Sequence, residues 1–204
     1  MCNINPEIMR KAKQLEFSRH GGRREGAGRR RGNRVSHAAR PRFGKPTPAH
    51  VTLRMRGHVW NLRSGRSYRR LQACFEKSSG RFDARLIEFS VQGNHLHLIV
   101  EAANDGSLSR ALQGLCIRIA RSLNAMMRRT GKVFADHYHA RLLRSPTELA
   151  RAIAYVLGNA AHHFGAAGVD SFSSAALVPA ERMTLLAPGE SWLLRIGLTR
   201  FAPG

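Results

Sequence analysis

Short segments of alternating hydrophobic and polar residues in the middle of the chain predict a β-sheet. Alternation is typical of a strand because successive side chains point to opposite faces. Segment 50–56 alternates in this way, and segment 94–101 is an apolar run that contains two histidines. Gln92 and Gly93 form a tight turn just before that run, which predicts an antiparallel pair. The predicted strands are 50–56, 83–91, 94–101 and 133–143.

Longer segments repeat their apolar residues every three to four positions, which predicts helices with one side facing a core. The predicted helices are 65–79, 107–129 and 145–164. Ser107 and Ser145 are the expected N-caps, and Glu148 is the acid of a capping box. The order β-α-β-β-α-β-α is typical of an α+β protein with a ferredoxin-like antiparallel sheet and helices packed on one face.

Composition divides the chain into a basic arm (1–49), a folded domain (50–165) and a C-terminal extension (166–204). Segment 18–49 is rich in Gly, Arg and Pro, and its few large apolar residues cannot bury enough surface to fold alone. We therefore expect a flexible, largely disordered arm that binds along the phosphates of a nucleic acid. The alternative is a tail that only increases solubility and has no binding role. The densest group of arginines in the arm is Arg29, Arg30 and Arg31.

Charge narrows the choice of partner. Lys and Arg total 34 and Asp and Glu total 13, which gives a formal charge of +21. Such an excess points to a polyanion, most often nucleic acid, and less to a membrane surface. The sequence has no apolar run of 18 residues and no leader-like stretch, so we expect neither a membrane span nor secretion. The three cysteines lie far apart, which fits a reducing cytoplasm.

The long predicted helix has two different sides. Its apolar residues fall within about 80°, which is the side expected to face the core. They are Leu108, Leu112, Leu115, Ile119, Leu123 and Met126. Five arginines without an acid among them fall on another side, where their repulsion is unfavourable unless an anion meets them. They are Arg110, Arg118, Arg121, Arg128 and Arg129. We expect a nucleic-acid contact there, with a plain solvated face as the alternative.

Two histidines and two residues of the last helix are the candidates for chemistry. His95 and His97 lie two apart in a predicted strand and so share a face, where they can hold a metal ion, although packed or exposed histidines are the alternative. Tyr155 and Asn159 lie one turn apart on the polar side of helix 145–164. The amide oxygen of Asn159 would be a third ligand and leave positions open for water and phosphate. A divalent ion would then polarise a phosphodiester for attack by Tyr155.

Other residues compete for these roles. His137 and His139 form a second histidine pair, for which a four-histidine zinc site is one option and packing or DNA contact the simpler one. Tyr138 lies between them and is the rival nucleophile, but it has no amide partner at helical spacing. Tyr68 has no supporting residues around it.

These motifs resemble those of a known family. His-Leu-His at 95–97 and Tyr-Val-Leu-Gly-Asn at 155–159 match the His-hydrophobic-His and Tyr-x-x-x-Asn/Gln pattern of HUH-type single-tyrosine transposases, the insertion-sequence-200-like superfamily. Within this superfamily the chain is most similar to the REP-associated tyrosine transposases. Segments 134–141 and 172–174 are also similar to segments of that group. The resemblance covers roughly 50–175.

The resemblance implies a DNA transposase and site-specific endonuclease that acts on single-stranded or hairpin DNA. Tyr155 would cut by transesterification to give a 5′-phosphotyrosine and a free 3′-hydroxyl, with Mg²⁺ or Mn²⁺ held by His95, His97 and Asn159. No external energy source is needed, because the bond energy is kept in the protein–DNA link. A monomer or a homodimer is expected. The alternatives are a relative that binds DNA hairpins without catalysis and a metal-dependent hydrolase that uses water.

Overall fold

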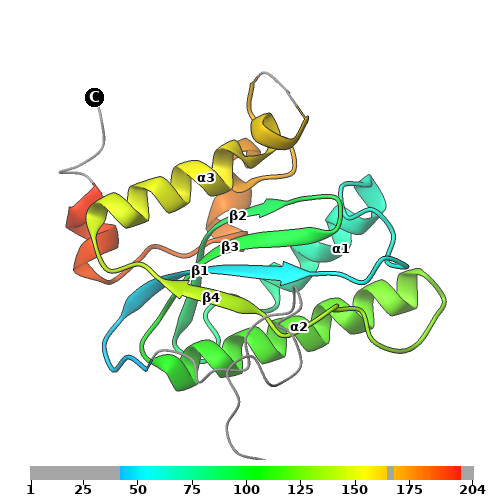
Figure 1. The fold of residues 1–204 in the computed structure, drawn as a ribbon, viewed down its shortest axis with the longest axis horizontal. Helices are drawn as coiled ribbons and strands as arrows, with labels where there is room; N and C mark the ends of the chain where they lie inside the picture. The colour runs from blue at the N-terminus through cyan, green and yellow to red at the C-terminus, as the bar shows by residue number, and fades with distance from the viewer. Residues whose placement is uncertain (1–41, 165–167, 199–204) are drawn as a thin grey trace, which may run out of the picture. The chain divides into compact units, whose positions relative to one another are not determined.

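Four antiparallel strands form a sheet in the order β2-β3-β1-β4 (Figure 1). The computed structural model describes residues 42–164 and 168–198, with the backbone alone at 160–164, and all of them belong to one compact unit. The strands are β1 Thr47–Arg54, β2 Ala84–Val91, β3 His95–Ala102 and β4 His139–Leu142. The arm residues Arg29, Arg30 and Arg31 lie outside the described residues.

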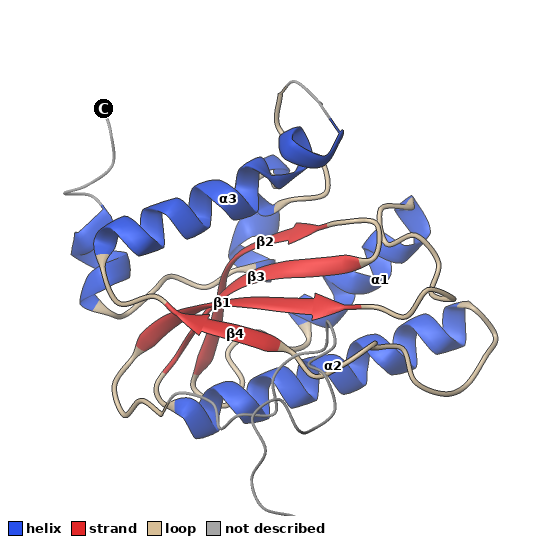
Figure 2. Cartoon of the chain, in the orientation of Figure 1, coloured by secondary structure: helices blue, strands red, loops and turns tan. Residues whose placement is uncertain are grey.

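Helices lie on both sides of this sheet, with α2 below it and α3 above it in Figure 2. The longer helices are α1 Gly65–Glu76, α2 Asp105–Met126 and α3 Pro146–Phe164. The shorter ones are α4 Pro179–Leu185 and the single turns η1 Ser174–Ala176 and η2 Leu193–Gly197. The predicted α+β class and the ferredoxin-like antiparallel sheet are confirmed.

The main core lies between one face of the sheet and the helices α1 and α2. Alternate residues of the central strands fill it, including Val51, Leu53, Leu96 and Leu98, all at most 1% exposed. Each large side chain buried in this way contributes about 1.5–3 kcal/mol, so this face holds most of the stability. The predicted apolar side of α2 is confirmed, because its residues from Leu108 to Leu123 are buried and Met126 packs against them.

The other face of the sheet is mostly polar and carries a small second core. Ile99 of β3 packs there with Leu143 and with Leu149 and Val156 of α3. The prediction that the helices pack on one face therefore holds for α1 and α2 but is wrong for α3. The reason is that the apolar side of α3 meets Ile99, whose side chain points away from the main core.

Two helix starts test the predicted caps. The cap of α2 is Asn104, not Ser107, because the Asn104 side chain accepts a hydrogen bond from the Ser107 N–H at 2.8 Å and Ser107 lies buried in the first turn. The Ser145 cap of α3 is confirmed, since its hydroxyl accepts from the Glu148 N–H at 3.2 Å.

Three strands differ in length from their predictions, and β2 differs by one residue only, since it begins at Ala84. β1 begins at Thr47, three residues before the predicted start, because Thr47 still pairs with Ala102 of β3. The last strand is shorter than the predicted 133–143, since the residues before His139 run as a loop. This loop forms an isolated bridge from Phe134 to Met55, the residue after β1.

Residues 168–198 return to the domain and pack against it. Arg63 forms a bidentate ion pair with Asp170, whose side chain is buried, and its guanidinium lies 4.6 Å from the centre of the Phe172 ring. The carbonyl of Phe172 accepts a hydrogen bond from the Val91 N–H at the end of β2. The start of the extension is therefore fixed to the edge of the sheet.

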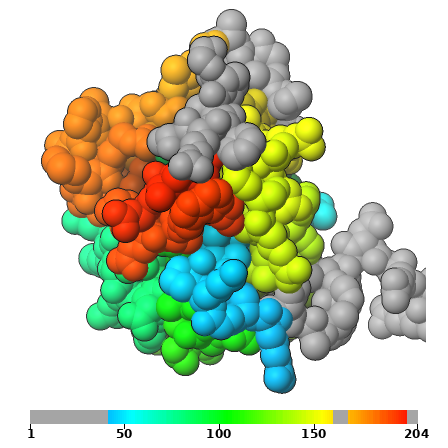
Figure 3. Space-filling view, turned by 90° about the vertical axis from the view of Figure 1, so that its left-hand side faces the viewer, coloured from blue at the N-terminus to red at the C-terminus, as the bar shows by residue number. Residues whose placement is uncertain are grey.

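A buried carboxylate holds the last described segment. Glu101 of β3 is fully buried and accepts hydrogen bonds from the backbone N–H groups of Glu190 and Ser191 at 2.7 and 2.8 Å. Leu193 and Leu194 of η2 then pack on the second core. Figure 3 shows this C-terminal segment in red, beside the start of β1 in blue and α3 in yellow.

The described helices include no candidate for a membrane-spanning segment. Across 42–164 and 168–198, none of them combines the length and the apolar character that a bilayer span requires.

Glu101→Gln is expected to lower the free energy of unfolding by about 2 kcal/mol, because the amide nitrogen of glutamine would face a backbone N–H that now donates to a carboxylate. Urea denaturation followed by circular dichroism measures the change. The control is Glu76→Gln on the exposed side of α1, which is expected to change stability by less than about 0.5 kcal/mol. Equal effects of the two substitutions would show that the carboxylate does not anchor the extension.

Candidate active site

The polar face of the sheet brings the predicted histidines together with residues of the other strands. His97 of β3 lies opposite Thr52 of β1 and Ser90 of β2. Thr52 in turn lies opposite His139 of β4. Paired residues of neighbouring strands point to the same face, so these side chains form a row across the sheet. His95 lies on the same face, two residues before His97.

His95 and His97 are arranged as a pair of possible metal ligands. Their ring centres are 4.8 Å apart and the rings are nearly perpendicular, at 89°. His97 is 5% exposed, whereas His95 is half-buried. Nδ1 of His95 lies 2.8 Å from Oδ1 of Asn94, an atom that can only accept a hydrogen bond. Nδ1 therefore carries the proton, and Nε2 carries the lone pair that a metal ion would use.

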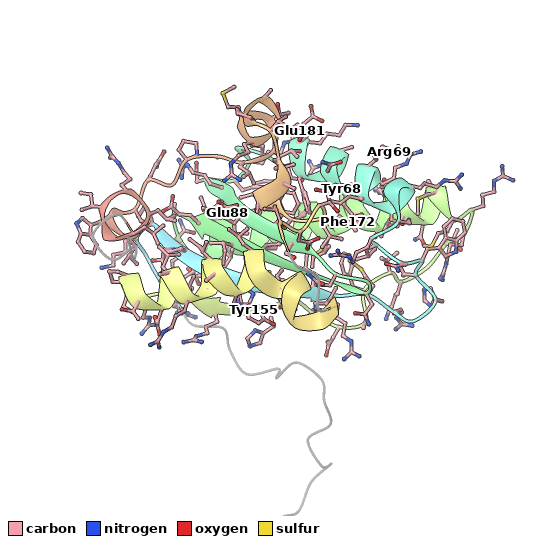
Figure 4. The ribbon with its side chains drawn as sticks, turned by 90° about the horizontal axis from the view of Figure 1, so that it is seen from above. Tyr68, Arg69, Glu88, Tyr155, Phe172 and Glu181 are labelled. Atoms are coloured by element: carbon pink, nitrogen blue, oxygen red, sulfur yellow. The ribbon has the colours of Figure 1, made fainter. Side chains whose placement is uncertain are left out.

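Tyr155 lies beside these imidazoles. It projects from α3 and is 43% exposed. Its ring centre is 5.3 Å from that of His97 and 5.7 Å from that of His50, and it stands edge-on to both. Figure 4 shows Tyr155 well apart from Tyr68 and Phe172. The structure thus brings the predicted nucleophile to the predicted histidines.

Asn159 lies one turn after Tyr155 on α3 and is fully buried. Among the described residues, neither its Oδ1 nor its Nδ2 has a hydrogen-bond partner. A buried amide without a partner costs about 1–3 kcal/mol, so another group must engage it for the position to be favourable. An amide oxygen and two imidazoles are a donor set that suits a divalent ion, and so the chemistry of His95, His97 and Asn159 fits a metal ion. No three His, Cys, Asp or Glu side chains of the described segments gather as a metal site, so such a site needs the amide.

His50 also belongs to this cluster, although the sequence alone indicates no functional role for it. Its Nε2 lies 3.1 Å from Nδ1 of His97, and Oγ1 of Thr52 lies 3.3 Å from the same nitrogen. Burial, followed by the charges of His139 and Arg141, lowers the pKa of His50 below its ordinary value. The alternation of β1 places His50 on the polar face, but local sequence does not show that β1 pairs with β3.

Comparison with known proteins identifies the family. The model of the family described as IS200-like transposases matches residues 49–157, more than half of the 204-residue chain. The chain belongs to the IS200-like transposase family. The matched range contains His95, His97 and Tyr155 and ends two residues before Asn159. No curated protein matches the chain significantly.

Two solved structures are similar to this transposase. One is described as a REP-associated tyrosine transposase bound to a REP hairpin; it is 16% identical, with a TM-score of 0.56, and the match covers 77% of this chain and 98% of that one. The other is a putative transposase from Deinococcus radiodurans R1, with 11% identity, a TM-score of 0.41 and coverage of 58% and 92%. The first likeness shows a shared fold. As a member of its family, this transposase is a DNA-processing enzyme whose partner is DNA.

The other two tyrosines of the transposase have packing roles. Tyr138, the rival nucleophile, is buried in the main core with its hydroxyl 3.1 Å from that of Ser109. Tyr68 stands edge-on to Phe172 at 5.1 Å between ring centres. Burial, followed by two nearby carboxylates, raises the pKa of Tyr68 to about 12. A phenol in that environment is a poorer source of phenolate than one open to solvent.

The second histidine pair does not join the first. His137 and His139 are both exposed. The four-histidine zinc site is not formed in the described part of the transposase, because no group of three or more potential His, Cys, Asp or Glu ligands occurs there. His139 remains on the polar face, in register with Thr52.

Arg110, Arg118 and Arg121 of α2 come from the layer opposite the histidines. The prediction that Arg128 and Arg129 belong to the same helix is wrong, because α2 ends at Met126 and the backbone of Arg128 has a positive φ of 51°. α2 packs on the core face of the sheet, whereas the cluster around His97 lies on the face that α3 partly covers (Figure 1). Three of the five are exposed and two are half-buried, and within the described residues none forms an ion pair with an acid. They are Arg110, Arg118, Arg121, Arg128 and Arg129. Sequence periodicity could not show which face of the sheet each helix would cover.

A cavity of about 1000 Å³ lies at the N-terminal end of α3. Segments 43–47, 142–146 and 190–193 line it. Neither Tyr155 nor any of the imidazoles contributes to its walls. The chemistry of the side chains, rather than the size of the hollow, therefore identifies the site.

Asn159→Ala is expected to raise the free energy of unfolding in EDTA by about 1 kcal/mol, because it removes a buried amide that has no partner within 42–159 and 168–198. The matched control is Asn124→Ala on α2, whose side chain donates to the Gly131 carbonyl at 2.8 Å and whose loss is expected to destabilise the protein. Both substitutions gain the same helix propensity, so urea denaturation compares the two amides directly. If Asn159→Ala costs as much as Asn124→Ala, the Asn159 amide is engaged within the protein.

Proposed function

We propose that this IS200-like transposase is an active single-tyrosine enzyme of the REP-associated type. It cleaves single-stranded or hairpin DNA with Tyr155 as the nucleophile, and a divalent ion, Mg²⁺ or Mn²⁺, is held by His95, His97 and Asn159. The observation that carries the proposal is the position of Tyr155, edge-on to His97 at 5.3 Å between ring centres. One turn later lies a buried amide for which the described side chains offer no partner.

In the proposed step, Oη of Tyr155 attacks the phosphorus of the scissile phosphodiester. The bond between Oη and phosphorus forms while the bond from phosphorus to O3′ breaks, so the 5′ end stays on the protein. The phenol gives up its proton, and the departing oxygen takes one up to become a 3′-hydroxyl. The bound ion would polarise the phosphate and neutralise its developing charge. Attack of a 3′-hydroxyl on the phosphotyrosine reverses the step and joins DNA ends.

The surroundings of Tyr155 support a DNA substrate. The ring is packed on one side by His50 and His97 and is open on the other, so a strand can reach Oη. Arg54 of β1, opposite His95, and Arg141 of β4, opposite His50, are both exposed, and Arg141 also pairs with Glu148 at 3.2 Å. Cations along the path of a strand bind its phosphates without regard to sequence.

A hairpin would occupy the arginine surface of α2 under this proposal. Three arginines of α2 and the two that follow it, Arg128 and Arg129, have no acidic partner within the described residues, and the chain carries a net charge of +21. The relative with a solved structure is described as bound to a REP hairpin. Binding of a duplex stem by α2 and cleavage of a flanking single strand on the other face would then be separate tasks.

A second candidate function follows from that separation. Because the arginine surface and the histidine cluster lie in different layers, the protein could bind hairpins without cutting them. Under this alternative the protein is a non-catalytic relative of the transposases that binds DNA hairpins, and His95 and His97 only pack against their neighbours.

Tyr155→Phe is expected to abolish the covalent protein–DNA adduct and leave hairpin binding unchanged, because it removes only the nucleophilic oxygen. The full chain is incubated with end-labelled hairpin DNA and Mn²⁺, and an SDS gel displays the adduct. The matched control is Tyr138→Phe, which removes an equivalent hydroxyl from the core and is expected to keep the adduct.

Each outcome of that experiment selects one reading. An adduct that persists in Tyr155→Phe assigns the nucleophile elsewhere. Cleavage by the wild type without any adduct supports the metal-dependent hydrolase, and binding without cleavage supports the hairpin-binding protein.

Arg121→Gln is expected to weaken hairpin binding and to reduce the slope of log affinity against log salt concentration by about 1, the effect of one lost phosphate contact. Cleavage of prebound hairpin should proceed at the wild-type rate, because Arg121 lies in the layer away from Tyr155. Arg195→Gln is the control, since Arg195 is also exposed but belongs to η2. An unchanged salt slope in Arg121→Gln would remove α2 from the DNA interface.

A further inference from the structure

We infer that His50 is a positioning residue that holds His97 in the orientation and tautomer in which Nε2 faces a metal ion. The inference rests on the proposed function, because it assigns a partner to one of the proposed ligands. Neither the match to the family nor the sequence motifs assign a role to His50.

The rings of His50 and His97 are in direct contact. Nε2 of His50 and Nδ1 of His97 are 3.1 Å apart, which is hydrogen-bond distance between two ring nitrogens. A neutral imidazole has one nitrogen that donates and one that accepts. One of these two rings must therefore donate to the other, and the pair has two possible arrangements.

Metal binding selects one arrangement. An imidazole that binds an ion uses one nitrogen and donates a hydrogen bond through the other, and this second bond fixes the ring. If His97 binds through Nε2, its Nδ1 carries the proton and Nε2 of His50 accepts it. The 3.1 Å separation of these two nitrogens suits such a hydrogen bond.

Thr52 is the competing partner of the same nitrogen. Its Oγ1 lies 3.3 Å from Nδ1 of His97, slightly farther than His50. A hydroxyl can donate or accept a hydrogen bond, so Thr52 stabilises both tautomers of His97 and favours neither. When Nδ1 of a neutral His50 ring carries the proton, Nε2 of that ring can only accept a hydrogen bond.

His50 also contacts the nucleophile. Its ring centre is 5.2 Å from that of His97 and 5.7 Å from that of Tyr155. The ring therefore packs against both a proposed ligand and the proposed nucleophile. Metal affinity isolates the effect on His97, because it is measured without DNA and without turnover.

The test compares His50→Gln with His50→Asn in the full-length protein. Both side chains carry an amide, but glutamine is longer by one methylene and its amide oxygen can reach the place of Nε2, whereas that of asparagine cannot. Mn²⁺ binding is measured by the loss of the free-ion EPR signal. We expect His50→Asn to weaken Mn²⁺ binding by about 10–100-fold and His50→Gln to remain close to the wild type.

Two controls guard this comparison. His139→Asn makes the same change at an imidazole on the same face, with Thr52 of β1 between it and His97, and it should leave Mn²⁺ binding unchanged. Thr52→Val removes the competing hydroxyl and keeps the shape of the side chain. Thermal denaturation in EDTA verifies that each variant is folded, and if His50→Asn does not fold, His50→Ala, which also lacks the acceptor, takes its place in the comparison with His50→Gln.

The failure of this inference is distinguishable from the failure of the proposed function. Wild-type affinity in His50→Asn, or a loss in Thr52→Val instead, overturns the role of His50 and leaves the metal site standing. A ten-fold or greater loss in His50→Gln also overturns it. If the wild type binds no Mn²⁺, or binds it equally well after His97→Ala, the proposed metal site fails and the role of His50 fails with it.

Discussion

The geometry of the candidate site depends on the two-residue period of β3. Leu96 and Leu98 point into the main core and are fully buried, so His95 and His97 must point to the other face. A shift of one residue would place imidazoles in the core and leucines outside, at a cost that the fold could not tolerate. Residues without a chemical role therefore set the register of the residues that carry the proposed chemistry.

The two faces of the sheet have different roles. The face under α1 and α2 contains nearly all of the large apolar side chains, whereas the face under α3 has a small core around Ile99 and a polar row around His97. α3 is held by Ile99 and by leucines of η2, and η2 in turn follows the segment anchored to Glu101. The position of Tyr155 thus depends on the C-terminal extension, which lies far from it in the sequence.

Much of this arrangement could be predicted because it follows from local periodicity. The strand alternation, the apolar side of α2 and the Ser145 cap are all properties of short segments, and the motif of His95, His97 and Tyr155 is equally local. The pairing of β1 with β3, the face that α3 covers and the complete burial of Asn159 are properties of distant segments. His50 was missed for that reason: it is an ordinary strand residue until β1 pairs with β3 and brings it next to His97.

The central claim is that Tyr155 forms the covalent bond to DNA, and the chain allows a direct test because its three tyrosines fall on different tryptic peptides. Tyr68 lies in 67–69, Tyr138 in 133–141 and Tyr155 in 152–182. The wild-type protein is incubated with hairpin DNA and Mn²⁺, digested with nuclease and trypsin, and examined by tandem mass spectrometry. The account predicts a nucleotide attached through a 5′-phosphate to Tyr155, in peptide 152–182. Attachment to Tyr138 or Tyr68, or cleaved DNA with all three tyrosines unmodified, would contradict it.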